Sequence, residues 1–208
     1  MRLTRPALVL ASVSVLLMAL NASAAKSTSW TDQAGDANGI NGEVVNESDL
    51  DAGVATPGSQ AGADIVKTEL ANTYTKVKGK SVCSGITATL ILAAPPVANM
   101  MYRISGPTTT APSIFNFEHD TGGGVDDLRH ASSATDDNNY SFTKPVKVTG
   151  NKIIFTLTVK DMKNIDEGPG SVMHGVKSTV AASIKGLLYL PILDKSAPAT
   201  ATNFTFCG

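Results

Sequence analysis

The stretch Ile153-Ile-Phe155-Thr-Leu157-Thr-Val159 decides the fold predicted for this chain. Large apolar side chains stand at every second position, and threonines fill most of the positions between them. This alternation is typical of a β-strand with one buried face. The strand follows the pair Gly150-Asn151, and another alternating run ends just before that pair, so we expect a tight hairpin turn there.

Short runs of the same kind recur on both sides of this strand, separated by glycine, proline and asparagine. The alanine-rich run 178–184 suits a helix in part, but Thr179 and Val180 disfavour one, so a strand is expected there too. The sequence therefore predicts an all-β fold, an antiparallel β-sandwich of about eight to ten strands with a jelly-roll or immunoglobulin-like topology. Besides 153–159, the expected strands are 65–70, 82–92, 101–104, 114–118, 140–142, 146–148, 172–184, 187–193 and 204–207.

Residues 1–25 have the three parts of a secretory signal peptide. Arg2 and Arg5 supply positive charge, an apolar run covers 8–20, and small residues after it form a cleavage site. The apolar run is shorter than the ~20 residues that a helix needs to cross a bilayer, so we expect cleavage and no stable membrane insertion. The mature chain, 26–208, would then be a single secreted domain, either extracellular or associated with the cell surface.

The charge of the mature chain is mildly negative. Cleavage would remove two arginines and leave 15 Lys and Arg against 18 Asp and Glu, a formal net charge of −3. No cluster of basic residues stands out in composition, which argues against nucleic acid and against anionic membrane surfaces as partners.

Two cysteines, Cys83 and Cys207, lie in the exported part of the chain. An even number of cysteines in an oxidising compartment predicts one disulfide, and a pair of buried free thiols is the alternative. A bridge between them would close a loop of 124 residues. In the chain-entropy treatment, closing a loop of this length stabilises a fold by about 4–5 kcal/mol.

An acidic loop punctuated by glycines, about residues 30–64, opens the mature chain. It lacks hydrophobic periodicity and has no Lys or Arg, and a long structureless loop needs something that ties it down. Carboxylates and amides at short spacing, with glycines between them, are the groups that Ca²⁺ requires. We therefore predict a calcium-binding loop, and a solvated acidic loop is the alternative. The acidic residues between 27 and 64 are Asp32, Asp36, Glu43, Glu47, Asp49, Asp51 and Asp64.

The start of this loop resembles a set of secreted bacterial domains. Thr31-Asp32-Gln-Ala-Gly35-Asp36-Ala-Asn38-Gly39 is followed, after a variable stretch, by Pro57-Gly58 and then by Asp64-Ile65 at the start of a strand. The pattern is similar to that of the DOMON-like, glucodextranase C-terminal-like and family-nine carbohydrate-binding-like β-sandwiches. The chain departs from it at Gln33, where proline is usual.

The resemblance implies that Asp32, Asp36 and Asp64 surround a calcium ion. Asn38 and Asn41 are added as ligands on chemical grounds, because neutral amide oxygens limit the repulsion between carboxylates around one ion. These five residues form the predicted metal site.

Other chemistry has weaker support in the sequence. The histidine and carboxylates of 119–127 suggest either a second metal or anion loop or a surface turn. There is no H-E-x-x-H and no G-x-S-x-G motif, and carboxylate pairs can be chosen freely, so we expect no enzyme. Aromatic residues make up 5% of the chain, with Trp30 beside the acidic loop, and this low content disfavours platforms for sugar binding.

The sequence thus predicts a secreted, non-catalytic binding or structural module, stabilised by calcium and one disulfide. Its partner is an unidentified extracellular or cell-surface ligand, with a polysaccharide as one candidate. A carbohydrate-binding module and a small secreted hydrolase are the two alternative functions.

Overall fold

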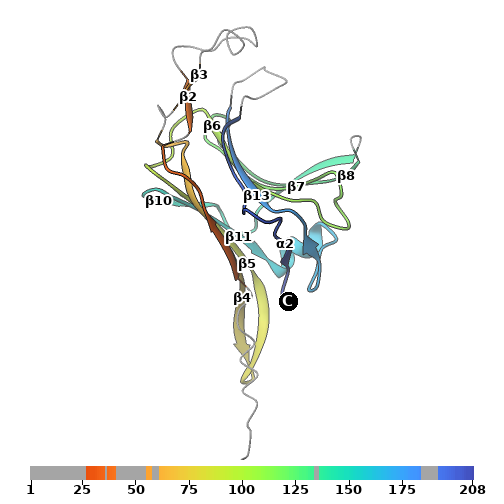
Figure 1. Ribbon diagram of the computed structural model, residues 1–208. Helices are drawn as coiled ribbons and strands as arrows, with labels where there is room; N and C mark the ends of the chain where they lie inside the picture. The colour runs from red at the N-terminus through yellow and green to blue at the C-terminus, as the bar shows by residue number, and fades with distance from the viewer. Residues whose placement is uncertain (1–26, 36, 41–54, 58–60, 134–135, 184–191) are drawn as a thin grey trace, which may run out of the picture.

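The computed structural model describes residues 27–35, 37–40, 55–57, 61–133, 136–183 and 192–208. The predicted signal peptide lies outside these residues. Two antiparallel main sheets pack face to face and form a β-sandwich, which confirms the predicted all-β fold (Figure 1).

The first sheet has five strands in the order β1-β4-β5-β11-β10. All of its neighbouring strands are antiparallel, and β10 turns into β11 at the Gly150-Asn151 hairpin predicted from the sequence. The strands are β1 (Ser27–Thr31), β4 (Ile65–Val77), β5 (Lys80–Leu92), β10 (Lys147–Thr149) and β11 (Lys152–Thr158).

The second sheet has six strands in the order β14-β13-β6-β7-β8-β9. They are β6 (Met100–Ser105), β7 (Ile114–Asp120), β8 (Val125–Ser133), β9 (Asp136–Ser141), β13 (Lys177–Ala182) and β14 (Ile192–Ser196). Two small ribbons complete the fold: β2 (Asn38–Ile40) with β3 (Ala55–Pro57), and β12 (Val172–Met173) with β15 (Phe204–Thr205).

The core lies between the inner faces of the two main sheets. Alternate residues of the central strands are fully buried, as the period of two in the sequence requires. Five of the six phenylalanines are buried, and Phe142 is partly buried against that core. The largest buried side chains are Tyr102, Phe115, Phe117, Phe155 and Phe206.

Polar contacts join the sheets along the edge where β1 and β4 meet β13 and β14. The indole Nε1 of Trp30 donates to Ser196 Oγ at 2.9 Å, and the hydroxyls of Thr68 and Ser178 lie 2.8 Å apart. All four side chains are buried, so these hydrogen bonds satisfy polar groups that would otherwise destabilise the interior.

The prediction of an irregular segment before residue 64 was wrong in part. Residues 27–31 form β1, which pairs with 67–71 of β4, and β2 pairs with β3. Trp30 explains the difference, because one large buried side chain and backbone pairing with β4 along the whole strand hold β1 in place without any apolar periodicity. Trp30 is therefore a core residue.

Two other elements differ from the prediction. The strand predicted for 153–159 stops at Thr158, where a short helix, α2 (Val159–Asn164), begins. Thr158 and Asp161 form a capping box, in which each side chain binds the backbone N–H of the other residue. In addition, 125–133 forms β8, a strand that the sequence analysis did not predict.

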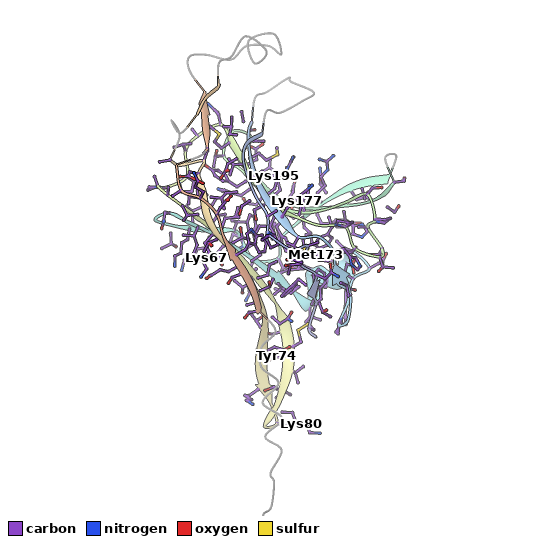
Figure 2. The ribbon with its side chains drawn as sticks, viewed as in Figure 1. Lys67, Tyr74, Lys80, Met173, Lys177 and Lys195 are labelled. Carbon is purple, nitrogen blue, oxygen red and sulfur yellow. A yellow bond between two sulfur atoms is a disulfide. The ribbon has the colours of Figure 1, made fainter. Side chains whose placement is uncertain are left out.

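The β4–β5 hairpin is long, with 13 residues in each strand, and its end projects beyond the sandwich (Figures 1 and 2). Tyr74 lies part of the way along this projection and Lys80 at its far end (Figure 2). The two central residues of its turn, Lys78 and Gly79, both have positive φ, at 49° and 80°. Such a turn matches the twist of the strands that it joins.

The predicted disulfide is present between Cys83 of β5 and Cys207, with Cα atoms 5.6 Å apart. Asn72 supports it from β4: its Nδ2 donates to Thr205 O, and its Oδ1 accepts from Cys207 N. The C-terminal residues are thereby fastened to the base of the projecting hairpin. In the part of the chain that the structure describes, no helix has the length and apolarity needed to span a membrane.

Candidate functional site

Two of the five predicted calcium ligands, Asp32 and Asp64, lie near the start of β4. Asp32 directly follows β1, and its backbone N–H donates to Val66 O at 3.0 Å. The side chain of Asp64 is 2% exposed, and its Oδ2 accepts from Gly35 N at 2.6 Å. The turn after β1 thus folds back onto the Asp64 carboxylate.

Close backbone packing holds Asp64 in place. The carbonyl oxygen of Asp64 accepts from Ala93 N at 2.8 Å, and that of Ala61 accepts from Ala94 N at 3.0 Å. Gly62 lies so near this neighbouring segment that a Cβ would sit 2.6 Å from Pro95 O. The small residues before Asp64 are therefore needed for the close approach.

Tyr102 reinforces the same position from the opposite sheet. Its hydroxyl donates to Gly62 O at 2.7 Å and accepts from Val97 N at 3.0 Å. Burial raises the pKa of Tyr102 to about 12, although the hydrogen bond from Val97 acts in the opposite direction. The phenol therefore stays neutral, and keeps both hydrogen bonds, at physiological pH.

Each of the two aspartates has one buried carboxylate oxygen that has no hydrogen-bond partner among the described residues. These atoms are Asp32 Oδ2 and Asp64 Oδ1. A buried carboxylate oxygen that is left without a partner is unfavourable by about 1–3 kcal/mol or more, so such atoms generally meet a proton, a water molecule or a cation. Two such oxygens on the residues predicted to bind calcium fit the chemistry of a hard cation.

For the other three predicted ligands, the structure describes no side-chain contact. Asp36 and Asn41 lie outside the described residues, and Asn38 is described only as the backbone that opens β2. Within the described ranges, no group of three or more His, Cys, Asp or Glu side chains is arranged to hold a metal ion. Within the described residues, the candidate site therefore consists of the carboxylates of Asp32 and Asp64.

A third carboxylate, Asp194 of β14, was missed as a site residue. It is 6% exposed, its Oδ2 accepts from Ile65 N at 2.6 Å, and its Oδ1 accepts from Lys195 N at 2.7 Å. An acidic residue directly after the apolar stretch that ends at Leu193 was the available signal. Asp194 helps to fix the start of β4, next to Asp64.

The histidine and carboxylates of 119–127 lie on the β7–β8 hairpin. His119 Nδ1 and Asp126 Oδ1 lie 2.5 Å apart across the two strands. Asp120 Oδ1 accepts from the backbone N–H groups of Gly122 and Gly123, so this carboxylate stabilises the turn. The surface turn, one of the two alternatives for this segment, accounts for the contacts of Asp120.

A charged ladder crosses the outer face of the same sheet. Arg103 Nε lies 2.6 Å from Glu118 Oε2, and Asp127 stands opposite Glu118 in the register of β7 and β8. Burial, together with the negative charges of Glu118 and Asp126, raises the pKa of Asp127. Arg103 therefore compensates the charge of Glu118, whereas Asp127 lies beside two other carboxylates.

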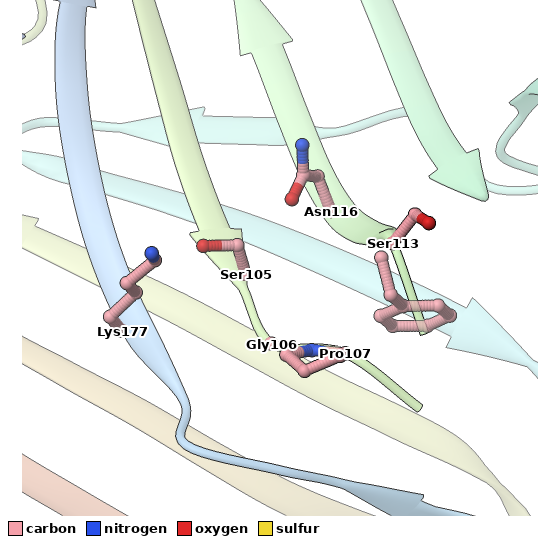
Figure 3. Close-up of a pocket in the computed structure, with 7 residues that line it drawn as sticks. Ser105, Gly106, Pro107, Ser113, Asn116 and Lys177 are labelled. Atoms are coloured by element: carbon pink, nitrogen blue, oxygen red, sulfur yellow. The ribbon is translucent and has the colours of Figure 1, made fainter. Parts of the chain in front are cut away.

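A shallow pocket of about 140 Å³ opens beside this ladder (Figure 3). Lys177 is the one ionisable side chain among its lining residues, and Ser105 and Asn116 point toward it from neighbouring strands (Figure 3). No acid–base pair lines this pocket, and none of the predicted site residues does. The complete lining is Ser105, Gly106, Pro107, Ser113, Phe115, Asn116 and Lys177.

A third buried carboxylate with an unpartnered oxygen is that of Glu167, which follows α2. Its Oε1 accepts from the hydroxyls of Thr108 and Thr110, and its Oε2 has no hydrogen-bond partner. The Thr110 hydroxyl also lies 3.3 Å from His130 Nε2. These contacts fasten the loop between β6 and β7 to the turn after α2.

No protein-family model, no curated protein and no solved structure matches the chain.

Proposed function

We propose that this protein is an exported, non-catalytic β-sandwich module in which Ca²⁺ fastens the N-terminal segment to the sandwich. The observation that carries the proposal is the pair of buried, unpartnered oxygens, Asp32 Oδ2 and Asp64 Oδ1. The resemblance of the opening motif to calcium-binding secreted sandwiches points the same way. Asp32 and Asp64 would hold the ion, with further oxygens from the loop between them.

The contacts of the described ionisable side chains support the non-catalytic assignment. His119 pairs with Asp126, Arg103 pairs with Glu118, and Asp161 caps α2. In each case the group already has a structural partner, and none lines the pocket near Lys177. This distribution favours a binding or structural role over hydrolysis, with an extracellular or cell-surface ligand as partner.

Thermal melting of the mature chain in calcium and in chelator tests the proposal. A ligand present at about a hundredfold its dissociation constant stabilises a fold by about 2.7 kcal/mol. For a domain of this size, we expect calcium to raise Tm by about 5–10 °C. The variants Asp32→Asn and Asp64→Asn should lose most of this rise, because each neutralises one proposed ligand.

Asp161→Asn provides the matched control. Asp161 is a buried carboxylate like Asp64, but both of its oxygens accept hydrogen bonds from Thr143 and Thr158. Its replacement should lower Tm by the same amount in calcium and in chelator. An identical Tm for the wild-type chain in the two conditions, or a full calcium response in Asp64→Asn, would contradict the proposal.

A further inference from the structure

The end of the β4–β5 hairpin is a two-stranded ribbon that stands clear of the sandwich. Among the described residues, β1 pairs with β4 only as far as Ala71, and β11 pairs with β5 only from Gly85 onward. Beyond the Cys83–Cys207 bridge, all eight residues of 75–82 are exposed. At about 3.3 Å per residue, this tip extends about 13 Å past the bridge.

The tip carries a dense positive charge. Lys76, Lys78 and Lys80 fall within five residues, and no Asp or Glu occurs between Glu69 and Glu118. Lys76 Nζ donates to Ser81 Oγ at 2.8 Å, and none of the three lysines forms an ion pair within the described part of the chain. A mature chain of net charge −3 therefore presents a locally cationic end.

Apolar side chains accompany these lysines. Val77 is 51% exposed and Val82 is 46% exposed, and they are two of the four large apolar side chains that are exposed among the described residues. In the register of the hairpin, Val77 pairs with Lys80 and Thr75 pairs with Val82. Because side chains alternate between the two faces of a strand, both valines lie on one face together with Lys80, and Lys76 lies on the other face with Tyr74 and Cys83.

The start of the described chain lies at this same end of the molecule. Ser27 is opposite Ala71, so the first described residue lies at the base of the hairpin.

We propose that the tip of this hairpin, residues 75–82, binds the surface of a bilayer that contains anionic lipids. The lysines would lie at the headgroups, and Val77 and Val82 would contact the boundary with the acyl chains. The expectation drawn from net charge, which disfavoured such surfaces, does not apply to a local cluster, because charges more than about 10 Å away are largely screened at physiological ionic strength. The binding is peripheral and needs no spanning segment.

Lysines on a free strand edge also protect a protein against edge-to-edge aggregation. That role alone would not require exposed valines on the same tip, since exposed apolar residues favour aggregation. A soluble anionic polymer would engage the lysines but would gain little from the valines. The combination of both residue types on a projecting tip therefore favours a lipid surface.

Co-sedimentation with vesicles tests the proposal on the mature chain. We expect binding to vesicles of phosphatidylglycerol and phosphatidylcholine in equal parts, and none to phosphatidylcholine alone. The variant Lys76→Gln/Lys78→Asn/Lys80→Gln should bind about a hundredfold more weakly, which is a factor of roughly five for each lysine near an anionic leaflet. Asn at position 78 tolerates the positive φ of the turn.

A second variant, Val77→Ser/Val82→Ser, tests the apolar contact. It should bind roughly tenfold more weakly than the wild-type chain, and its remaining binding should vanish at high salt, since only the electrostatic contact is left. Circular dichroism and Tm of both variants should match those of the wild-type chain because every substituted residue is exposed.

The β10–β11 hairpin provides a matched control. Lys147 and Lys152 belong to this hairpin and Lys144 precedes it in the chain. All three lysines are exposed, as is Val148, and Lys152 adjoins Asn151, which binds Leu92 at the end of the sheet opposite the tip. Replacing these three lysines with glutamine removes the same charge and should leave vesicle binding unchanged. Vesicle binding is measured both in calcium and in chelator. The test of the hairpin tip then does not depend on whether the calcium proposal holds.

Three outcomes would overturn the proposal. The first is no binding to the anionic vesicles. The second is an equal loss of binding in the tip variant and the control variant, which would indicate attraction by overall charge. The third is binding to a soluble polyanion such as polyphosphate that depends on the tip lysines but not on the valines, with no vesicle binding.

Discussion

At the scale of single residues, Asp161 shows how one carboxylate organises two segments. Its Oδ1 accepts from the backbone N–H and the hydroxyl of Thr143, and its Oδ2 accepts from the same groups of Thr158. Burial alone would raise the pKa of Asp161, but these four hydrogen bonds outweigh it and lower the pKa below its ordinary value. The charged form is therefore the one that the fold stabilises.

Asp161→Asn should destabilise the protein by about 1–3 kcal/mol at neutral pH, because buried donors lose their acceptors. The folded-state pKa lies below that of the unfolded chain, so the carboxylate's contribution is present above the unfolded pKa and is lost as pH falls through the folded one. In urea titrations, the gap in stability between wild type and variant should narrow on acidification.

The exposed Asp166, which lies just after the same helix, provides the comparison for Asp161. Asp166→Asn should change stability little at any pH, because an exposed carboxylate stays hydrated in both states. A difference in unfolding free energy between wild type and Asp161→Asn that stays constant from neutral to acidic pH would contradict the stabilising role of the charged Asp161 carboxylate.

Sequence reasoning found only some of these residues, and the reason is physical. Asp32 and Asp64 were singled out because the opening motif resembles that of calcium-binding secreted domains, and their role as ligands remains a prediction. Asp161 and Asp194 bind groups that are distant in sequence, Thr143 and Ile65, and only the folded chain brings them within hydrogen-bond distance. Asp36 and Asn41 lie outside the described residues, and their predicted role remains a prediction.

At the scale of elements, Gly85 controls how β5 lies against β11. Its φ is +147°, and a Cβ at this position would lie 2.1 Å from Leu157 O. We expect Gly85→Ala to lower the free energy of unfolding by about 3 kcal/mol, since both the backbone conformation and the packing oppose a side chain. Urea denaturation measures this loss.

Gly79 at the tip of the hairpin is the control for Gly85. It also has positive φ, at 80°, but a Cβ there would meet nothing within 4 Å. Gly79→Ala should therefore lower the free energy of unfolding by only about 1 kcal/mol, which is the part of the loss that comes from the backbone conformation. Similar losses for the two variants would show that the close contact with Leu157 does not matter.

The predicted elements were reliable where one face of a strand is buried. The run from Ile153 and the turn at Gly150-Asn151 were confirmed, because alternation and turn chemistry are local properties. By contrast, β8 has polar and charged residues on its outer face, such as Asp127, and its only buried residues are Leu128, His130 and Ala131. A strand with so few apolar residues shows little hydrophobic periodicity in its sequence.

At the scale of the whole molecule, the Cys83–Cys207 bridge closes a loop of 124 residues around most of the fold. Reduction, or the double variant Cys83→Ser/Cys207→Ser, should lower the free energy of unfolding by about 2–5 kcal/mol. Denaturation midpoints with and without reductant measure the effect. An unchanged midpoint for the reduced wild-type chain would contradict it, and the double variant, which has no bridge, should not respond to reductant.

The overall architecture was predictable, but the distribution of charge over it was not. Alternation and cysteine count implied a disulfide-linked β-sandwich, and the structure has one. Net charge averages over the chain, however, and so hid the cationic tip around Lys78. Which residues project from a sandwich depends on where neighbouring strands end, and that is a property of the complete sheet.

The pairing of Ser27 with Ala71 and the anchoring of Cys207 beside Asn72 bring the two ends of the described chain to one place. A short linker from Gly208 to Ser27 would therefore span only a small gap. New termini could then be opened at the exposed turn Gly150-Asn151 without interrupting any strand. The fold is thus well suited to circular permutation, which would free the base of the hairpin from chain ends.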